Sequence, residues 1–375
     1  MAALLASCKD TDSSAVEADQ NRGAQVAGGE YAGFKVRELA RGLQHPTSLL
    51  FLPDGNMLVS ERAGRLRRVS RNGFVSAPLA GVPHLSQRGA LWDIAVIPSR
   101  EAERTLFLAF LEPRADGSLG ATVARARLES LFLADVQIIH RQDSLPAGSA
   151  DAGMQLAFHE NGRLFIGYSG PSTTASMQPN GDVITSGTLL RVDASGRAPR
   201  TNPFAGPGHA ALWTYGHGSI RGLAFDPRTG KLWMAENGPG DSGEINIAKA
   251  GRSFALIAAN AADIAAPLRA EPQAGIPALP EAPRHAWSQA PQLSGLAFYT
   301  GRPGAPWNDS VFVGSTDGGY VTRLMLSGDR VVGEERLLQD KGLRVADVQV
   351  DTDGDLFVLT EGTDGRLLQI TPPDH

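Results

Sequence analysis

Apolar residues occur in short runs along most of the chain, and Gly, Pro, Asn or Asp separate one run from the next. A representative stretch has apolar residues at 223–225, a turn at 226–230 and apolar residues again at 232–234. Short runs bounded by turn-forming residues are typical of antiparallel β-strands. The pattern therefore predicts an all-β protein.

The same two-strand unit recurs six times. The paired runs lie at 48–52 and 57–59, 94–97 and 106–108, 156–158 and 163–166, 223–225 and 232–234, 296–299 and 310–313, and 347–350 and 355–359. Several units end in a further strand in which Leu or Val alternates with Arg, as at 64–69 and 366–370. Because a single small sheet cannot bury both of its faces, six such sheets are expected to stack around an axis. We predict a six-bladed β-propeller over residues 31–375.

Three local features refine this architecture. Residues 31–42 are expected to add a strand to the sheet of the last repeat and so close the ring. The Asp-Gly and Asn-Gly pairs at 54–55, 161–162 and 353–354 are interpreted as hairpin turns rather than calcium loops. Residues 256–290, rich in Ala and Pro, are interpreted as a long connection over one face.

Composition narrows the class of partner. The net charge of -5 argues against nucleic-acid binding, which needs a basic face. No run approaches the roughly 18 apolar residues of a membrane span. Cys8 is the single cysteine, so an intramolecular disulfide is excluded.

The residues before Cys8 suggest a lipid anchor. Leu5-Ala6-Ser7-Cys8 resembles the lipobox of bacterial lipoproteins, in which the cysteine is lipidated. Residues 1–30 are therefore predicted to be a truncated lipoprotein signal and a disordered tether. The protein would then face the periplasm from the bacterial cell envelope, and Cys8 would be its only membrane contact. The alternative is a chance match, with Cys8 a thiol in a terminal segment.

Residues 43–66 resemble the first repeat of the bacterial soluble aldose and glucose dehydrogenases that use pyrroloquinoline quinone (PQQ). Residues 212–251, 296–301 and 336–373 fit the same family, and the similarity covers residues 36–373. The resemblance implies oxidation of a sugar at its anomeric carbon, with hydride transfer to PQQ. It also implies a histidine base, cations that bind the PQQ carboxylates, and a calcium ion held partly by the carbonyls of a Gly-Pro pair.

The resemblance assigns roles to particular residues. Asp151 takes the place of the histidine base, five residues before Leu156, and a carboxylate with an ordinary pKa of about 3.9 serves as a base when burial raises that pKa. The other assignments are Gln87 beside the substrate, Gly238 and Pro239 at calcium, and Arg344, Trp287 and the additional Arg221 at the cofactor.

By the same resemblance, three cofactor-binding cations of the family are absent from this chain. Gly218 and Ala346 replace arginines, and Asp317 replaces a lysine. Each charge-assisted hydrogen bond contributes roughly 1.5–3 kcal/mol, so these exchanges weaken the binding of the PQQ trianion at the family's cofactor site. Three hypotheses about the function therefore stay open.

The first hypothesis is a PQQ- and calcium-dependent sugar dehydrogenase with Asp151 as base. The second is a catalytically inactive propeller lipoprotein that binds a sugar, a glycan or a protein partner. The third is a calcium-dependent propeller hydrolase, which requires carboxylates such as Asp93, Asp151, Glu236 and Asp317 to converge on an axial ion.

Overall fold

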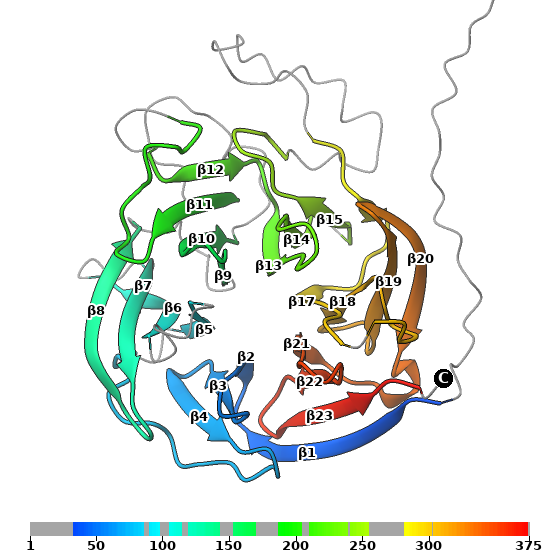
Figure 1. Cartoon of the computed structure of the whole chain (residues 1–375). Coiled ribbons are helices and arrows are strands. Elements are labelled where there is room, and N and C mark those ends of the chain that lie inside the picture. Colours follow the sequence, from blue (N-terminus) through cyan, green and yellow to red (C-terminus); the bar gives the residue numbers. More distant parts are fainter. Residues whose placement is uncertain are drawn as a thin grey trace, which may run out of the picture.

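A computed structural model describes most of the chain. The described residues are 33–85, 90–97, 105–114, 119–142, 153–169, 187–204, 210–238, 241–254, 281–301 and 303–373. Within these ranges, six antiparallel sheets stand in a ring around a central axis (Figure 1). The predicted six-bladed β-propeller is confirmed.

Each blade begins with its innermost strand and runs outward, except that blade 6 takes its outermost strand from the start of the chain. Blade 1 contains β2 (Pro46–Phe51), β3 (Met57–Glu61) and β4 (Arg65–Val69). Blade 2 contains β5 (Ala90–Val96), β6 (Thr105–Pro113), β7 (Leu119–Leu128) and β8 (Leu133–Arg141). Blade 3 contains β9 (Met154–Phe158), β10 (Arg163–Tyr168), β11 (Thr188–Asp193) and β12 (Leu212–Tyr215).

Blade 4 contains β13 (Ser219–Phe225), β14 (Leu232–Asn237), β15 (Gly243–Ile247) and β16 (His285–Trp287). Blade 5 contains β17 (Leu293–Phe298), β18 (Ser310–Ser315), β19 (Val321–Ser327) and β20 (Arg330–Leu337). A short 3-10 helix (Gln339–Lys341) leads to blade 6, which contains β21 (Val345–Val350), β22 (Leu356–Thr360), β23 (Gly365–Thr371) and β1 (Lys35–Leu43).

The first described strand closes the ring. β1 runs antiparallel to β23, with Lys35 opposite Thr371 and Leu43 opposite Gly365. In Figure 1 the blue β1 lies along the outer edge of the red β23. The predicted N-terminal strand that completes the last blade is therefore confirmed, with Lys35–Leu43 as its described bounds.

One sequence interpretation needs correction. The range 256–290 is not wholly a connection, because His285–Trp287 form β16 and pair with β15 as the fourth strand of blade 4. Residues 255–280 lie outside the described part of the chain. The three predicted hairpin turns are confirmed, since Gly55, Gly162 and Gly354 have φ values of 78°, 77° and 91°.

The core lies between the blades. Every residue of β14, β18 and β22 is buried, because neighbouring blades cover both faces of these middle strands. This two-sided burial explains why these strands contain continuous apolar runs, at 232–235, 311–313 and 356–359, rather than alternating ones. Among the described helices none is long and apolar enough to cross a membrane.

Side chains join every pair of neighbouring blades near the axis. Each of the six seams contains a buried or half-buried hydrogen bond between a side chain of one blade and the backbone of the next. The bonds are Thr47 Oγ1 to Leu91 O (3.0 Å), Leu156 N to Asp93 Oδ2 (2.7 Å), Ser169 Oγ to Ile220 O, Leu293 N to Asn237 Oδ1 (2.8 Å), Ser294 Oγ to Val345 O (2.6 Å) and Leu49 N to Asp347 Oδ2 (2.8 Å).

Candidate functional site

Five innermost strands contain a β-bulge close to their first residue. A bulge places one extra residue opposite its partner strand and redirects that side chain, and bulges are frequent beside active sites. The extra residues, found where the pairing register shifts, are Thr47, Trp92, Arg221, Gly295 and Ala346. The bulges therefore place a set of equivalent positions around one end of the axis.

Two of these bulge residues meet near the axis together with Arg62. The Trp92 side chain is buried, with 7% of the residue exposed. The Cζ atoms of Arg62 and Arg221 lie 4.7 Å and 5.8 Å from the centre of the Trp92 ring. Arg62 belongs to the β3–β4 turn of blade 1 and Arg221 to blade 4, so residues from three blades make this cluster. We call these three residues the arginine–tryptophan cluster.

A glutamate links this cluster to Arg344. The Arg344 Nη2 atom lies 2.7 Å from Glu361 Oε2, and Arg62 Nη2 lies 3.7 Å from Glu361 Oε1. Arg344 directly precedes β21, and Glu361 follows β22. Three guanidinium groups thus lie at the end of the axis where the innermost strands begin.

A buried hydrogen-bond network fixes the loop before β13. His217 Nδ1 lies 3.0 Å from Glu236 Oε1, and His217 Nε2 lies 2.7 Å from Thr214 Oγ1. The backbone N–H of Gly218 also donates to Glu236. Burial, together with the nearby charge of Glu236, raises the pKa of Glu244 to about 7. The network holds the approach to Arg221 in place.

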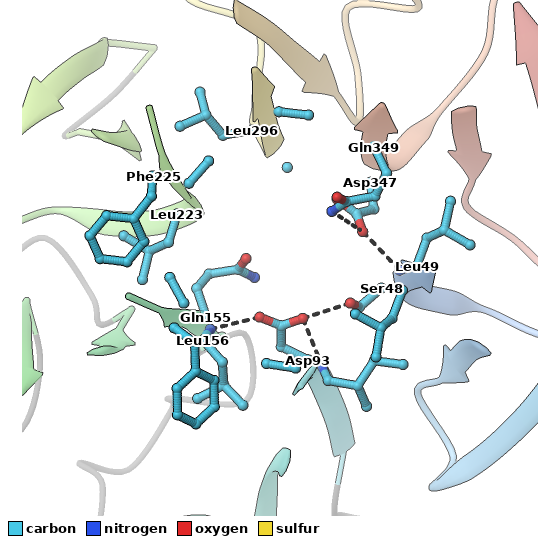
Figure 2. Close-up of a pocket in the computed structure, with 18 of the residues that line it drawn as sticks. Ser48, Leu49, Asp93, Gln155, Leu156, Leu223, Phe225, Leu296, Asp347 and Gln349 are labelled. Atoms are coloured by element: carbon cyan, nitrogen blue, oxygen red, sulfur yellow. Dashed lines mark hydrogen bonds between the residues drawn. The ribbon is translucent and has the colours of Figure 1, made fainter. Parts of the chain in front are cut away.

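A cavity of about 310 Å³ lies along the axis. Its lining begins at the bulges, with Thr47, Gly295 and Ala346, and continues toward the last residues of the innermost strands, such as Phe158 and Val350. Figure 2 shows Asp93 and Asp347 facing this space, together with Gln155. Burial raises the pKa of Asp93 to about 6 and that of Asp347 to about 7, although both carboxylates accept backbone hydrogen bonds.

Comparisons with known proteins identify the architecture. The model of the glucose/sorbosone dehydrogenase family matches residues 43–369. The aldose sugar dehydrogenase YliI of Escherichia coli is 32% identical over 352 residues, which are 91% of this chain and 94% of that protein. This chain belongs to the glucose/sorbosone dehydrogenase family.

Solved structures agree with this assignment. The crystal structure of the soluble aldose sugar dehydrogenase from Escherichia coli in its apo form gives a TM-score of 0.79 at 32% identity, covering 90% of this chain and 99% of that one. An aldose sugar dehydrogenase from Streptomyces coelicolor, solved in its PQQ-bound form, shares the fold with a TM-score of 0.72 at 23% identity, covering 91% and 99% of the two chains.

The structure of this glucose/sorbosone dehydrogenase family member brings some predicted site residues to one end of the axis. Arg221 lies at the start of β13, Arg344 precedes β21, and Gly238 follows β14, whose last residues pair with the start of β13. The Gly238 N–H donates to the Ser242 carbonyl at 2.8 Å. Gln87, Asp151 and Pro239 lie outside the described residues, so their predicted roles stay predictions.

Trp287 is not brought to the axis. It lies on β16, the outermost strand of blade 4, and its indole N–H donates to Glu334 Oε2 of blade 5 at 2.9 Å. Trp287 is also not among the residues that line the axial cavity. The expectation that Trp287 lines the channel therefore needs correction, because the intervening strands β13 to β15 separate it from the axis.

The described carboxylates do not converge as the hydrolase hypothesis requires. Asp93 faces the axial cavity, Glu236 binds His217, and Asp317 Oδ1 accepts the Gln292 N–H at 2.6 Å. Within the described ranges, no group of three or more His, Cys, Asp or Glu side chains is arranged to hold a metal ion.

Sequence reasoning missed Arg62 and Trp92. Both residues lie within stretches that match the family, but neither stands out by its type or spacing. Trp92 directly precedes Asp93 and occupies the bulge position that Arg221 occupies in β13. Alignment of the repeats could therefore have drawn attention to Trp92.

Proposed function

We propose that this protein is a PQQ-dependent aldose dehydrogenase whose active site lies at the end of the axis where the innermost strands begin. The observation that carries the proposal is the group of three arginines, Arg62, Arg221 and Arg344, at that end of a chain that belongs to the family. Guanidinium groups bind carboxylates strongly, so this donor set fits a cofactor with three carboxylates.

The proposed reaction divides clearly between cofactor and protein. Bound PQQ supplies a two-electron acceptor for the hydride of the anomeric carbon. Asp151 accepts the proton of the anomeric hydroxyl as that carbon becomes the carbonyl carbon of a lactone, so a hydride and a proton leave the sugar together. Gln87 orients the sugar by hydrogen bonding, and the arginines hold the cofactor carboxylates.

Calcium forms part of the same proposal. The described side chains offer no cluster of metal ligands, and calcium, a hard cation that binds oxygen, also accepts backbone carbonyls as ligands. Gly238 follows Asn237. The Asn237 side-chain amide donates to the Leu293 carbonyl and accepts the Leu293 N–H. These bonds hold the Gly238 segment between blades 4 and 5, where its carbonyl would serve as a ligand together with that of Pro239.

A catalytically inactive sugar-binding propeller is the second candidate. It is favoured by the state of His217, a histidine at this end of the axis whose two ring nitrogens both bond within the protein. Asp317 adds a negative charge where the family resemblance implies a lysine.

Whether the protein is a dehydrogenase or an inactive propeller, we propose that a lipid on Cys8 holds it at the cell envelope.

The first experiment is calorimetric titration of the full chain with PQQ, with and without calcium, followed by addition of aldoses and an electron acceptor. Binding and sugar oxidation support the dehydrogenase, and Asp151→Asn should then lower kcat by about 100-fold or more, while the exposed control Asp364→Asn leaves it unchanged. Binding of sugar without oxidation supports the inactive propeller. Failure to bind PQQ at high micromolar concentration overturns the dehydrogenase proposal.

A further inference from the structure

We propose that Arg62 and Arg221, brought together on Trp92, form a relocated carboxylate-binding site for PQQ. The identity of the ligand rests on the proposed function, whereas the arrangement of Arg62, Arg221 and Trp92 is observed in the structure. The family resemblance implies cofactor cations at 218, 317 and 346, where this chain has Gly, Asp and Ala. The described structure supplies guanidinium groups at the same end of the axis from other positions.

The first argument is positional. Arg62 comes from blade 1 and Arg221 from blade 4, which lie on opposite sides of the ring in Figure 1, yet both guanidinium groups lie within 6 Å of one indole ring. The backbone carbonyl of Arg62 also accepts the Leu91 N–H at 2.9 Å, so the turn that carries Arg62 is tied to the strand that carries Trp92. The cluster exists only when the ring is closed.

The second argument concerns unmet hydrogen bonds. Trp92 Nε1 and Arg62 Nε are both buried, and neither has a hydrogen-bond partner among the described residues. Buried donors in folded proteins are nearly always paired with protein, water or ligand. Two unpaired donors on adjacent groups, each able only to donate, favour an acceptor at this place, supplied by water or by a ligand. Carboxylate oxygens meet that need.

The third argument concerns space beside Arg221. A Cβ atom added at Gly153 would lie 3.0 Å from Arg221 Nη1 and 3.7 Å from Trp92 Cε3. Glycine at this position therefore lets the Arg221 guanidinium reach across from blade 4 to Trp92. Glu361 contacts both Arg62 and Arg344 and so holds Arg344 beside the cluster.

Binding measurements with two probes test the proposal. The probes are PQQ and benzene-1,3,5-tricarboxylate, a trianion that has no quinone chemistry, and calorimetry gives Kd for each. Arg221→Gln and Arg62→Gln should each raise both Kd values by about 10- to 150-fold. Arg221→Lys, which keeps the charge but not the planar fork, should lose less affinity than Arg221→Gln.

A matched control variant is available in blade 3. Arg191 Cζ lies 4.1 Å from the centre of the Trp213 ring on the outer strands β11 and β12, so Arg191→Gln removes an arginine stacked on a tryptophan outside the cluster and should leave both Kd values unchanged. Circular dichroism of each variant shows that the propeller has folded. Trp92→Phe, which keeps an aromatic ring but removes the N–H, should raise Kd severalfold.

The outcomes separate the two proposals. Weaker binding of both probes in Arg221→Gln and Arg62→Gln supports the relocated site, even if no sugar is oxidised and the dehydrogenase proposal fails. Tight PQQ binding that is unchanged in both folded variants overturns the relocated site and leaves the dehydrogenase proposal standing. If the wild-type chain binds neither probe, the relocated site is also overturned.

Discussion

At the scale of single residues, Asp93 and Asp347 combine two demands that oppose each other. Each carboxylate accepts backbone hydrogen bonds across a seam, which favours the ionised form, while burial disfavours it. Burial is the larger effect, and it raises the two pKa values to about 6 and about 7 from an ordinary 3.8. Both groups therefore bind protons more tightly in the folded protein than in the unfolded one.

The sign of the pH dependence follows from these raised pKa values. Between the unfolded and folded pKa values the folded state holds more protons, so the free energy of unfolding falls as pH rises and recovers on acidification. Asp93 should contribute a loss of about 1–2 kcal/mol between pH 5 and pH 8. Asp93→Asn should therefore show a smaller change over this range, measured by urea unfolding at both pH values.

The comparison also accounts for groups that titrate in the same range. Burial raises the pKa of Glu244 and lowers that of His140, so their contributions have opposite signs, but both are common to the wild type and the variant. Asp347 is not, because the charge of Asp93 helps to raise the pKa of Asp347, so Asp93→Asn also lowers that pKa and reduces the pH dependence further. Asp364→Asn, at an exposed side chain, serves as control and should retain the wild-type pH dependence. An Asp93→Asn variant with the full wild-type dependence would show that Asp93 is ionised throughout.

At the scale of elements, β1 is the strand that joins the two ends of the described chain. Its burial is uneven, because the strand lies on the outside of blade 6. Leu43 is fully buried and Ala40 nearly so, whereas Val36 is 42% exposed. Leu43 packs with the core between blades 6 and 1, together with residues such as Leu359 and Leu367. Ring closure should therefore depend on the end of β1 rather than its beginning.

Two substitutions in β1 test this difference. Leu43→Ala leaves a cavity in a closely packed region and should lower the free energy of unfolding by about 2–5 kcal/mol. Val36→Ala removes apolar atoms from an exposed position and should change it by no more than about 0.5 kcal/mol. Denaturant titration of both variants measures the difference. Equal effects would mean that β1 contributes by strand pairing alone.

The burial of the strands and their bulges decide what could be predicted from the sequence. The blades were predictable because two-sided burial leaves a continuous apolar run in each middle strand, and the hairpin turns require glycine at positive φ. The contacts around Trp92 were not, because a one-residue bulge decides whether a side chain meets the axis. Trp287 shows the opposite error, since an aromatic residue at a family position proved to lie on an outermost strand.

At the scale of the whole molecule, the six seams form one closed system. Hydrogen bonds from side chains cross every seam, and small residues set the spacing between blades 4, 5 and 6. A Cβ atom added at Gly222 would lie 2.7 Å from the Gly295 carbonyl carbon and 2.7 Å from Leu296 Cβ. Because the obstacle includes backbone, β13 and β17 would have to separate. In a closed ring, a wider seam must be absorbed by the other five.

Gly222→Ala should therefore destabilise the whole propeller rather than one blade. We expect a loss of about 1–3 kcal/mol, typical of overpacking, with circular dichroism and tryptophan fluorescence reporting a single shared unfolding transition. Gly342→Ala is the control, because its added Cβ meets open space and only its positive φ of 57° adds strain, at a cost of about 1 kcal/mol. If fluorescence and circular dichroism separate in Gly222→Ala, the seams open independently, and the ring is a set of weakly coupled blades.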